Sequence, residues 1–464
     1  MKIINANIQE IKQDRLVRFN YKTLLLLEKV DSFFNENTQY IRLNELFNMV
    51  NGFAFSSNDY VGEGVSLVRI GDLNDDIVQC GTAFLPNSYL ESYSNYIIKK
   101  GDILVSLTGD GKMKSAVSSN DNMLLNQRVG ALRPKEDLNI MFYYYLLNTD
   151  IVKTQFELFS NGKSQLNISP KDFLNIRIPI IDKNKISQIM EKITPIEKAL
   201  IDDKSKIIST QTIIDDIFAK KFGFDYVTFE KLKSKKRFTI DFKMFSNNPD
   251  LRFSVKFHRN AGEFVMKQIT NITNKKIKHF LAEPIVLGAS LSPNDYSDNG
   301  DYLYISMATI KNWCFDSDDA ARLKVAYSNE KMSKTVKCND ILMARSGEGT
   351  IGKVALIKDD DFQGIFSDFT MRIRFANYNH LFAYYYLRTS YFQYLVEVYK
   401  KGLGNNTNIF PIVIQEFPVP DLTLSEQKRI VTAIQSEIVK QDNTRAKIIK
   451  LRKQIDDVIE NVLT

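Results

Sequence analysis

The sequence predicts an α+β protein made of two tandem copies of one unit, each a mixed β-sheet region with helices followed by a long helix. The first observation is a repeat, because Asn58-Asp59-Tyr60 recurs 236 residues later as Asn294-Asp295-Tyr296. The second is that Asp102-Ile103-Leu104 recurs 238 residues later as Asp340-Ile341-Leu342. The third is an isoleucine-rich, heptad-like pattern at the end of each copy. A nearly constant offset over this length indicates duplication of a whole unit, which suits a two-part target.

Short β-type runs separated by glycine and asparagine turns fill the first part of each copy, about residues 10–183 and 248–421. Their apolar residues alternate or cluster over strand-like lengths. A helical piece follows, and its tyrosines Tyr143–Tyr145 recur 241 residues later as Tyr384–Tyr386. Such clusters are more typical of a half-buried core than of platforms on which bases stack.

A long helix is expected to end each copy, over residues 184–222 and 422–464. Apolar residues recur at heptad-like steps of three, four or seven along the first helix and at steps of three or four within two groups of the second, which is typical of a coiled-coil seam: Ile189, Ile193, Ile196, Leu200, Ile207, Ile214 and Ile217, then Ile430, Ile434 and Ile438, and Ile448, Leu451, Ile455 and Val458. Pro195 predicts a kink or a late start for the first helix. The basic segment 223–247 is interpreted as a linker.

The length of these helices suggests a use. A helix of about 40 residues is roughly 60 Å long, and one turn of B-DNA is about 34–36 Å. Two such helices paired antiparallel can hold two readers a full turn or more apart. The alternative is an ordinary helical hairpin that completes each copy.

Composition sets broad limits. The chain has 464 residues, a formal net charge of +7 and three cysteines in no metal-binding spacing. It has no secretory signal pattern and no apolar run of about 18 residues, so we expect a cytoplasmic protein without a membrane segment. The modest positive charge permits a polyanionic partner without requiring one.

The motifs that resemble enzyme sites are incomplete. Residues 347–353 satisfy the G-x-x-x-x-G-K start of a phosphate-binding loop, but Val354 stands where serine or threonine would reach magnesium. A strand-like run follows, so we expect a strand–turn–strand loop. Asp421 and Glu426 are too close for a metal-dependent nuclease hairpin, and the three histidines lie far apart. We therefore expect no catalytic, cofactor-binding or metal site.

Several motifs in the expected order resemble the specificity (S) subunits of Type I restriction–modification systems. They are the duplication itself, the 101–106 motif with its glycine turn, Asn126–Gly130, and Pro418–Pro420 followed by Ser425–Ile430. Copy one departs from the pattern, because residues 179–184 lack the proline–valine–proline and Ser-Glu-Gln signature.

The resemblance implies a non-catalytic subunit with two target-recognition domains, here residues 1–183 and 248–421, each reading half of a bipartite site in double-stranded DNA. It implies that the spacer helices form an antiparallel coiled coil and dock two methyltransferase subunits. Those partners would bind S-adenosylmethionine and methylate adenine, and translocating restriction subunits join them in the full complex.

DNA contacts are expected from exposed polar residues on the glycine loops, the adjacent strands and a second polar loop. Lysine and arginine neutralise phosphates, arginine also binds guanine, and amide side chains bind adenine. The candidates are Lys112, Lys114, Gln127, Arg128 and Gln165 in copy one, and Arg345, Lys353, Arg372, Arg374, Asn405 and Asn406 in copy two.

Two other functions stay open at this point. A duplicated scaffold or adaptor would bind protein and show no sequence-dependent DNA affinity. A phosphate-loop NTPase would lose ATP turnover on substitution of Lys353.

Overall fold

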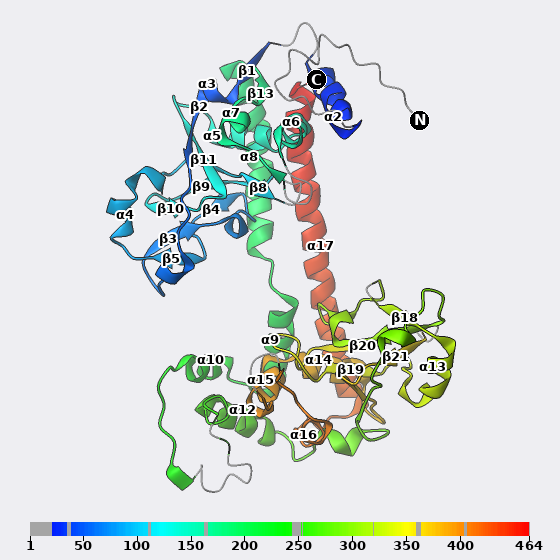
Figure 1. Ribbon diagram of the computed structural model, residues 1–464. Helices are drawn as coiled ribbons and strands as arrows, with labels where there is room; N and C mark the ends of the chain where they lie inside the picture. Colours follow the sequence, from blue (N-terminus) through cyan, green and yellow to red (C-terminus); the bar gives the residue numbers. More distant parts are fainter. Residues whose placement is uncertain are drawn as a thin grey trace. The chain divides into compact units, whose positions relative to one another are not determined.

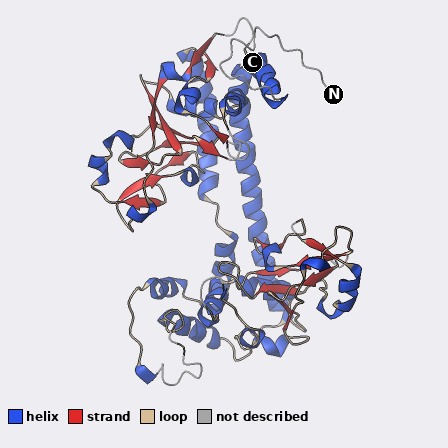
Figure 2. Cartoon of the chain, in the orientation of Figure 1, coloured by secondary structure: helices blue, strands red, loops and turns tan. Residues whose placement is uncertain are grey.

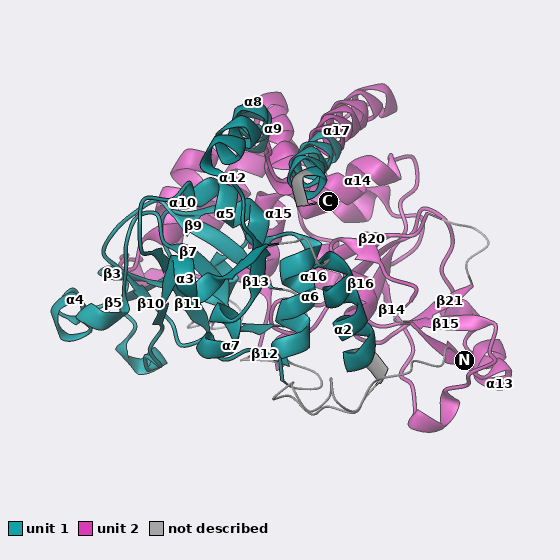
Figure 3. Cartoon of the chain, turned by 90° about the horizontal axis from the view of Figure 1, so that it is seen from above, with its two compact units in different colours: residues 1–206, 445–464 teal, residues 207–444 magenta. Residues whose placement is uncertain are grey.

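A computed structural model describes residues 21–34, 39–109, 113–161, 166–243, 252, 254–318, 320–358, 363–402 and 406–463 (Figure 1). The chain forms two compact units, unit 1 with residues 1–206 and 445–464 and unit 2 with residues 207–444 (Figure 3). The boundary between the units falls inside one continuous helix, α17 (Leu424–Leu463).

Unit 1 contains a five-stranded and a four-stranded sheet. The five-stranded sheet has the order β2 (Phe47–Asn51), β11 (Val129–Pro134), β7 (Ile103–Ser106), β9 (Ser115–Ser118) and β4 (Ile77–Val78). The four-stranded sheet has the order β5 (Ala83–Leu85), β3 (Val65–Val68), β10 (Met123–Leu125) and β6 (Ile97–Ile98). Two small pairs join β1 (Tyr40–Arg42) to β13 (Arg177–Pro179) and β8 (Thr108–Gly109) to β12 (Leu166–Asn167).

Unit 2 repeats this arrangement. Its first sheet has the order β14 (Val286–Leu287), β22 (Thr370–Ile373), β19 (Ile341–Ala344) and β20 (Val354–Leu356). Its second sheet has the order β18 (Ala321–Leu323), β15 (Tyr302–Ile305) and β21 (Gly364–Phe366), and a hairpin joins β16 (Ile310–Lys311) to β17 (Cys314–Phe315). In both units the second sheet contains one parallel pair at the same place, β3 with β10 and β15 with β21. The predicted duplication is therefore present in the strand order.

Helices pack beside the sheets of each unit (Figure 2). Unit 1 has α2 (Tyr21–Phe33), α3 (Leu43–Leu46), α4 (Tyr89–Ser92), α5 (Ile140–Leu147), α6 (Asp150–Phe159), α7 (Pro170–Leu174) and α8 (Lys183–Ser205). Unit 2 has α9 (Thr210–Phe222), α10 (Tyr226–Ser234), α12 (Asn260–Thr270), α13 (Val325–Glu330), α14 (His380–Arg388), α15 (Ser390–Tyr399) and α16 (Pro411–Ile414). The α+β prediction is confirmed.

The predicted apolar seam is buried or half-buried along its whole length. In unit 1 the residues of α8 and of the C-terminal part of α17 share one core with the sheet, among them Ile193, Leu200, Ile455 and Ile459. In unit 2, α9 pairs antiparallel with the N-terminal part of α17, since Ile208 N donates to Gln441 Oε1 (3.0 Å) and Lys221 pairs with Glu426 (3.4 Å).

A half-buried carboxylate connects the sheet region of unit 1 to both of its long helices. Asp76 accepts hydrogen bonds from Lys204 Nζ on α8 (2.7 Å), Tyr144 Oη on α5 (2.9 Å) and Arg452 Nη2 on α17 (3.2 Å). Burial raises the pKa of Asp76, but the contacts with Lys204, Arg452 and Tyr144 outweigh it, so the pKa lies below 3.8.

The structure differs from the sequence prediction at two places in the helices. The first long helix is not continuous, because α8 ends at Ser205 and α9 begins after Ser209, whose hydroxyl caps it by accepting from Thr212 N (3.0 Å). Pro195 lies inside α8, so of the two alternatives that the sequence left open the late start does not occur. Within the expected linker, residues 226–234 form α10, anchored by the buried Phe229.

The tyrosine helices align with an offset of 240 residues, not 241. Asn139 caps α5 by accepting from Phe142 N, and Asn379 caps α14 by accepting from Phe382 N. Tyr144 is therefore the structural equivalent of Tyr384. Both are buried, as are Tyr385 and Tyr386, which confirms that the tyrosines belong to the core.

Candidate nucleic-acid interface

A tight turn presents two of the predicted residues of copy one. Residues 126–128 join β10 to β11, and the turn closes through Val129 N donating to the Asn126 carbonyl (2.9 Å). Gln127 N donates to the Phe53 carbonyl (2.9 Å), and Gly52 packs so closely that a Cβ there would lie 1.9 Å from the Asn126 oxygen. The backbone is thus fixed, while the side chains of Gln127 and Arg128 are exposed.

Unit 2 holds an equivalent turn with different side chains. Residues 367–369 join β21 to β22, and Thr370 N donates to the Ser367 carbonyl (3.0 Å). Gly288 packs against it as Gly52 does in unit 1, since a Cβ there would lie 1.9 Å from the Phe366 oxygen. The turn presents Asp368, half-buried, and Phe369, which is 46% exposed.

An arginine and an apolar residue exchange places between the two copies. In unit 1, Leu107 N donates to the Arg128 carbonyl (2.9 Å). At the same position in unit 2, Arg345 N donates to the Phe369 carbonyl (2.9 Å). Each unit therefore pairs one arginine with one apolar residue at this position. The arginine lies on the presenting turn in unit 1 and on the segment after β19 in unit 2.

Arg345 joins three segments of unit 2. Its Nε donates to the Asp368 carbonyl (2.6 Å), and its Nη1 donates to Asn408 Oδ1 (3.3 Å). The guanidinium carbon lies 5.9 Å from the centre of the Phe369 ring. Asn408 Nδ2 in turn donates to the carbonyl of Asn406, whose side chain is exposed. The structure thus brings together two predicted residues, Arg345 and Asn406, around the 367–369 turn.

The other candidates of copy one are less well defined. Lys114 is exposed, and its Nζ donates to Asn74 Oδ1 (2.9 Å). Lys112 and Gln165, and Asn405 of copy two, lie outside the described residues.

The glycine loop of copy two is a strand–turn–strand connection, as predicted. It joins the antiparallel strands β19 and β20, and Gly347, Gly349 and Gly352 have φ values of 86°, 79° and 83°, which favour glycine. No helix follows, so a phosphate-binding loop of the NTPase kind is not formed. Lys353 is half-buried and lines a pocket of about 510 Å³ within unit 2.

The structure differs from the exposure that the sequence predicts for Arg372, which is buried, and for Arg374, which is half-buried. Arg372 has 7% side-chain exposure and pairs with Glu283 (2.6 Å). Arg374 binds Asp340, whose side chain is 1% exposed, and also pairs with Glu283 (3.1 Å). These carboxylates occupy the guanidinium groups, so the two arginines hold the sheet together.

The sequence interpretation missed Asp368 and Phe369. The signal was available, because the offset of 241 residues that relates β11 to β22 places them opposite Gln127 and Arg128. Among the described residues, we find no cluster of acidic, histidine or cysteine side chains suited to a metal ion. The helices within the described ranges are all too short or too polar to cross a membrane.

Comparisons with known proteins agree on one family. Residues 35–210 and 284–453 match the family model described as Type I restriction modification DNA specificity domain. The chain is 28% identical over 178 residues to the Type I restriction enzyme MjaVIII specificity subunit of Methanocaldococcus jannaschii, covering 37% of this chain and 42% of that protein. It is 29% identical over 107 residues to the EcoAI specificity subunit of Escherichia coli, covering 21% of this chain and 18% of that protein. The chain thus spans less than half the length of these relatives.

A solved structure is also similar. The S subunit of a Type I restriction–modification system from M. genitalium is 13% identical, with 92% of this chain and 96% of that chain covered and a TM-score of 0.40.

Proposed function

Because the chain belongs to the Type I restriction–modification DNA specificity family, we propose that it is a specificity subunit whose two units each read one half of a bipartite site in double-stranded DNA. The observation that carries this proposal is the pair of equivalent turns, 126–128 and 367–369. Their backbones are fixed in the same way, but they expose different side chains. Two recognition units with the same backbone but different exposed side chains suit a DNA site whose two halves differ in sequence.

The exposed residues at each turn, together with the half-buried Arg345, define the proposed contacts. Arg128 and Arg345 can neutralise a phosphate or bind guanine, while Gln127 can bind adenine. Phe369 suits contact with a thymine methyl group or a wedge between base steps. Lys114 and Asn406 lie on adjacent loops of their units and complete the set. Because direct contact needs accessible side chains, Arg372 and Arg374 are left out.

The chain itself is proposed to be non-catalytic. Methyltransferase subunits would bind S-adenosylmethionine and transfer the methyl group to adenine, and restriction subunits would join in a larger complex. We propose that α8, α9 and α17 fix the spacing between the readers and offer their polar faces to two methyltransferase subunits in the cytoplasm.

Adenine-methylation mapping tests the proposal. A plasmid library is methylated in cells that carry this chain with its cognate methyltransferase subunit, and the modified motif is read out. A single split motif with a fixed gap is expected. If the complex assembles but no motif appears, the chain is a protein-binding scaffold instead.

A further inference from the structure

Arg388, at the end of α14, carries a buried positive charge with no carboxylate partner among the described residues. Its Nη1 donates to Tyr384 Oη (2.9 Å), and its guanidinium lies 5.1 Å from the ring centres of both Trp313 and Tyr384. Its Nε is buried and has no hydrogen-bond partner. Aromatic faces and one hydroxyl compensate a guanidinium only in part, because a buried charge normally needs a hydrogen-bonded counter-charge.

The equivalent position in unit 1 has no such charge. With the offset of 240 residues, Asn148 stands where unit 2 has Arg388. Asn148 Nδ2 donates to Ser115 Oγ and to the Tyr144 carbonyl, both at 2.8 Å. The amide is thus satisfied inside unit 1. The fold does not require a cation here, so the arginine is particular to unit 2.

Arg388 lines the pocket of about 510 Å³ that also contains Lys353. A second polar atom without a partner belongs to the same lining, the buried Oε1 of Gln211. The pocket lies within the usual volume range for small-ligand sites, roughly 300–1,000 Å³. The unpartnered Arg388 Nε is a donor that an acceptor ligand can complete, whereas the Gln211 oxygen needs a donor.

The charges around the pocket favour an anion. Its lining includes Arg388, Lys353 and Lys400 against two glutamates, Glu348 and Glu397. Burial raises the pKa of Glu397, but hydrogen bonds from Lys256 and Lys400 outweigh it and lower the pKa. Glu397 is therefore ionised and already paired with two lysines, so it does not neutralise Arg388.

The nearby N-terminus of α15 adds little to the attraction for an anion. The Ser390 amide there already donates to Asp215 Oδ1 (2.8 Å), and the Ser390 hydroxyl donates to Asp215 Oδ2 (2.6 Å). The case for an anion rests on the side-chain cations.

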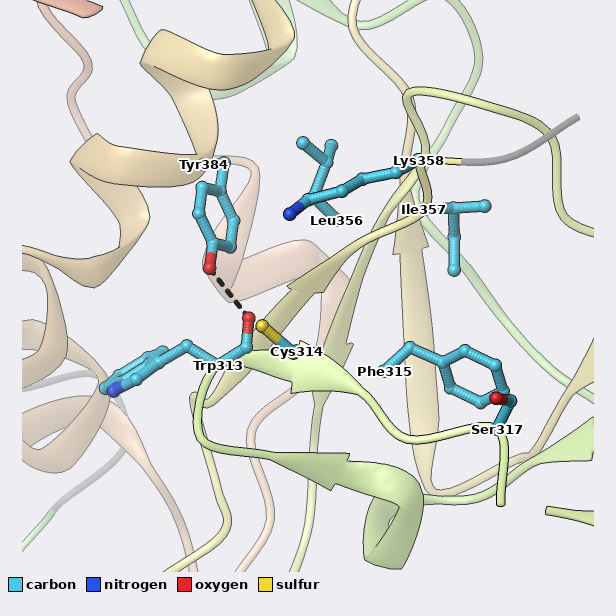
Figure 4. A pocket seen from close by; sticks show the side chains of 8 residues that line it. All are labelled: Trp313, Cys314, Phe315, Ser317, Leu356, Ile357, Lys358 and Tyr384. Carbon is cyan, nitrogen blue, oxygen red and sulfur yellow. Dashed lines mark hydrogen bonds between the residues drawn. The ribbon is translucent and has the colours of Figure 1, made fainter. Parts of the chain in front are cut away.

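The wall of the pocket contains a tryptophan in an unusual backbone conformation. Asn312 and Trp313 form the two-residue turn between β16 and β17, with φ values of 49° and 65°. A bulky residue at positive φ is an outlier, and such strain persists where the surroundings hold it. Figure 4 draws a second pocket on the other side of this hairpin, which shares Trp313 with the first. It shows Tyr384 Oη donating to the Trp313 carbonyl (2.7 Å), while the indole points away from Phe315 and Lys358. The backbone bond and Arg388 together fix this side chain beside the pocket.

We propose that this pocket of unit 2 binds one phosphate group, with the Arg388 guanidinium and the Lys353 ammonium as its cationic ligands. Arginine binds phosphate oxygens through charge-assisted hydrogen bonds that are about twice as strong as neutral ones. The phosphate can belong to the DNA backbone or to a free phosphate monoester. The first source rests on the proposed function, whereas the second does not require that the chain read DNA.

The tryptophan supplies a direct readout, because Trp313 is the single tryptophan of the 464-residue chain. Inorganic phosphate is titrated into the full chain at constant ionic strength, and indole fluorescence is followed. A parallel titration uses a short DNA duplex. Arg388→Gln removes the buried charge, and Lys353→Gln removes the half-buried one. Lys311→Gln is the matched control, because it removes a surface charge, paired with Asp316 (3.3 Å), from the same hairpin as Trp313.

A saturable fluorescence change is expected for the wild type and for Lys311→Gln. Lys353→Gln should weaken binding at least about tenfold, which corresponds to 1.4 kcal/mol, and Arg388→Gln should abolish it while circular dichroism stays unchanged. If Arg388→Gln does not fold, Lys353→Gln decides alone. A response to phosphate identifies a free ligand, and a response to DNA alone that Lys353→Gln weakens identifies the backbone. No saturable response to either titrant, or equal binding by the wild type and Lys353→Gln, overturns the proposal.

Discussion

Arg374 binds the Asp340 carboxylate bidentately, because Nε donates to Oδ1 (2.6 Å) and Nη2 donates to Oδ2 (2.7 Å). Asp340 also accepts from Lys337 N (2.8 Å). The same arrangement stands in unit 1, where Arg133 binds Asp102 at 3.0 and 2.6 Å. A feature that both copies keep while their exposed turns differ belongs to the scaffold and not to the reading of sequence.

Removal of one member of this pair should loosen the first sheet of unit 2. Asp340→Ala leaves the guanidinium without its buried partner, and breaking a buried pair in this way costs roughly 3 kcal/mol. Amide hydrogen exchange should rise in β19 and β22 and stay unchanged in β7 and β11 of unit 1. Arg128→Ala is the control, because an exposed arginine should change stability by less than about 0.5 kcal/mol. Unchanged protection in β19 would contradict this assignment.

Gly52 and Gly288 should be intolerant of even one added methyl group. Each Cβ would lie 1.9 Å from a backbone oxygen next to or within a presenting turn, so the turn must move or the strand must shift. Gly52→Ala and Gly288→Ala should each lower the melting temperature measurably, whereas Gly62→Ala should not, since a Cβ there meets nothing within 4 Å. Equal melting temperatures for all three variants would show that the backbone of each turn can shift at little cost in stability.

Much of the fold can be predicted from this sequence, because the repeat and the apolar periodicity are both encoded locally. The break at 206–209 could not be predicted from the seam, since Ile207 keeps the heptad spacing and only the Ser209 cap reveals a new start. The two inward arginines, Arg372 and Arg374, could not be recognised from charge alone. Their carboxylate partners come from segments 34 to 89 residues away, and no local pattern connects them.

Asp76 should make the stability of unit 1 depend on pH. Its pKa in the folded chain is lowered below 3.8, so the ionised carboxylate stabilises the fold above about pH 3.8. That contribution is lost as the pH falls through the folded-state pKa. Asp76→Asn should cost about 2 kcal/mol at neutral pH, since hydrogen bonds to charged groups contribute roughly 1.5–3 kcal/mol.

The measurement is the difference in melting temperature between the wild type and Asp76→Asn as a function of pH. It should be largest near neutral pH and shrink below pH 3.8. Asp75→Asn is the control, because its side chain is 75% exposed. A difference that stays constant down to pH 2 would show that Lys204 and Arg452 do not depend on the charge of Asp76.

The exchanged arginines predict how sequence preference can be moved between the units. Leu107 with Arg128 and Arg345 with Phe369 occupy equivalent backbone positions, joined by the same 2.9 Å hydrogen bond. The double variant Arg345→Leu/Phe369→Arg therefore gives unit 2 the pair that unit 1 has and keeps the hydrogen bond between the two backbones, although it removes the bond from Arg345 Nε to the Asp368 carbonyl. Because side chains read the groove while the backbone only positions them, we expect a changed base preference in the half-motif read by unit 2 and the other half-motif to be unchanged.

The readout is methylation mapping with the cognate methyltransferase subunit, and Lys358→Gln serves as a control outside the turn. Loss of all methylation by the variant in a correctly assembled complex would mean that Arg345 and Phe369 supply DNA affinity without selecting bases. A motif identical to that of the wild type would place the reading groups elsewhere in unit 2. A change in both half-motifs would contradict the independence of the two readers, because each turn draws its contacts from its own unit.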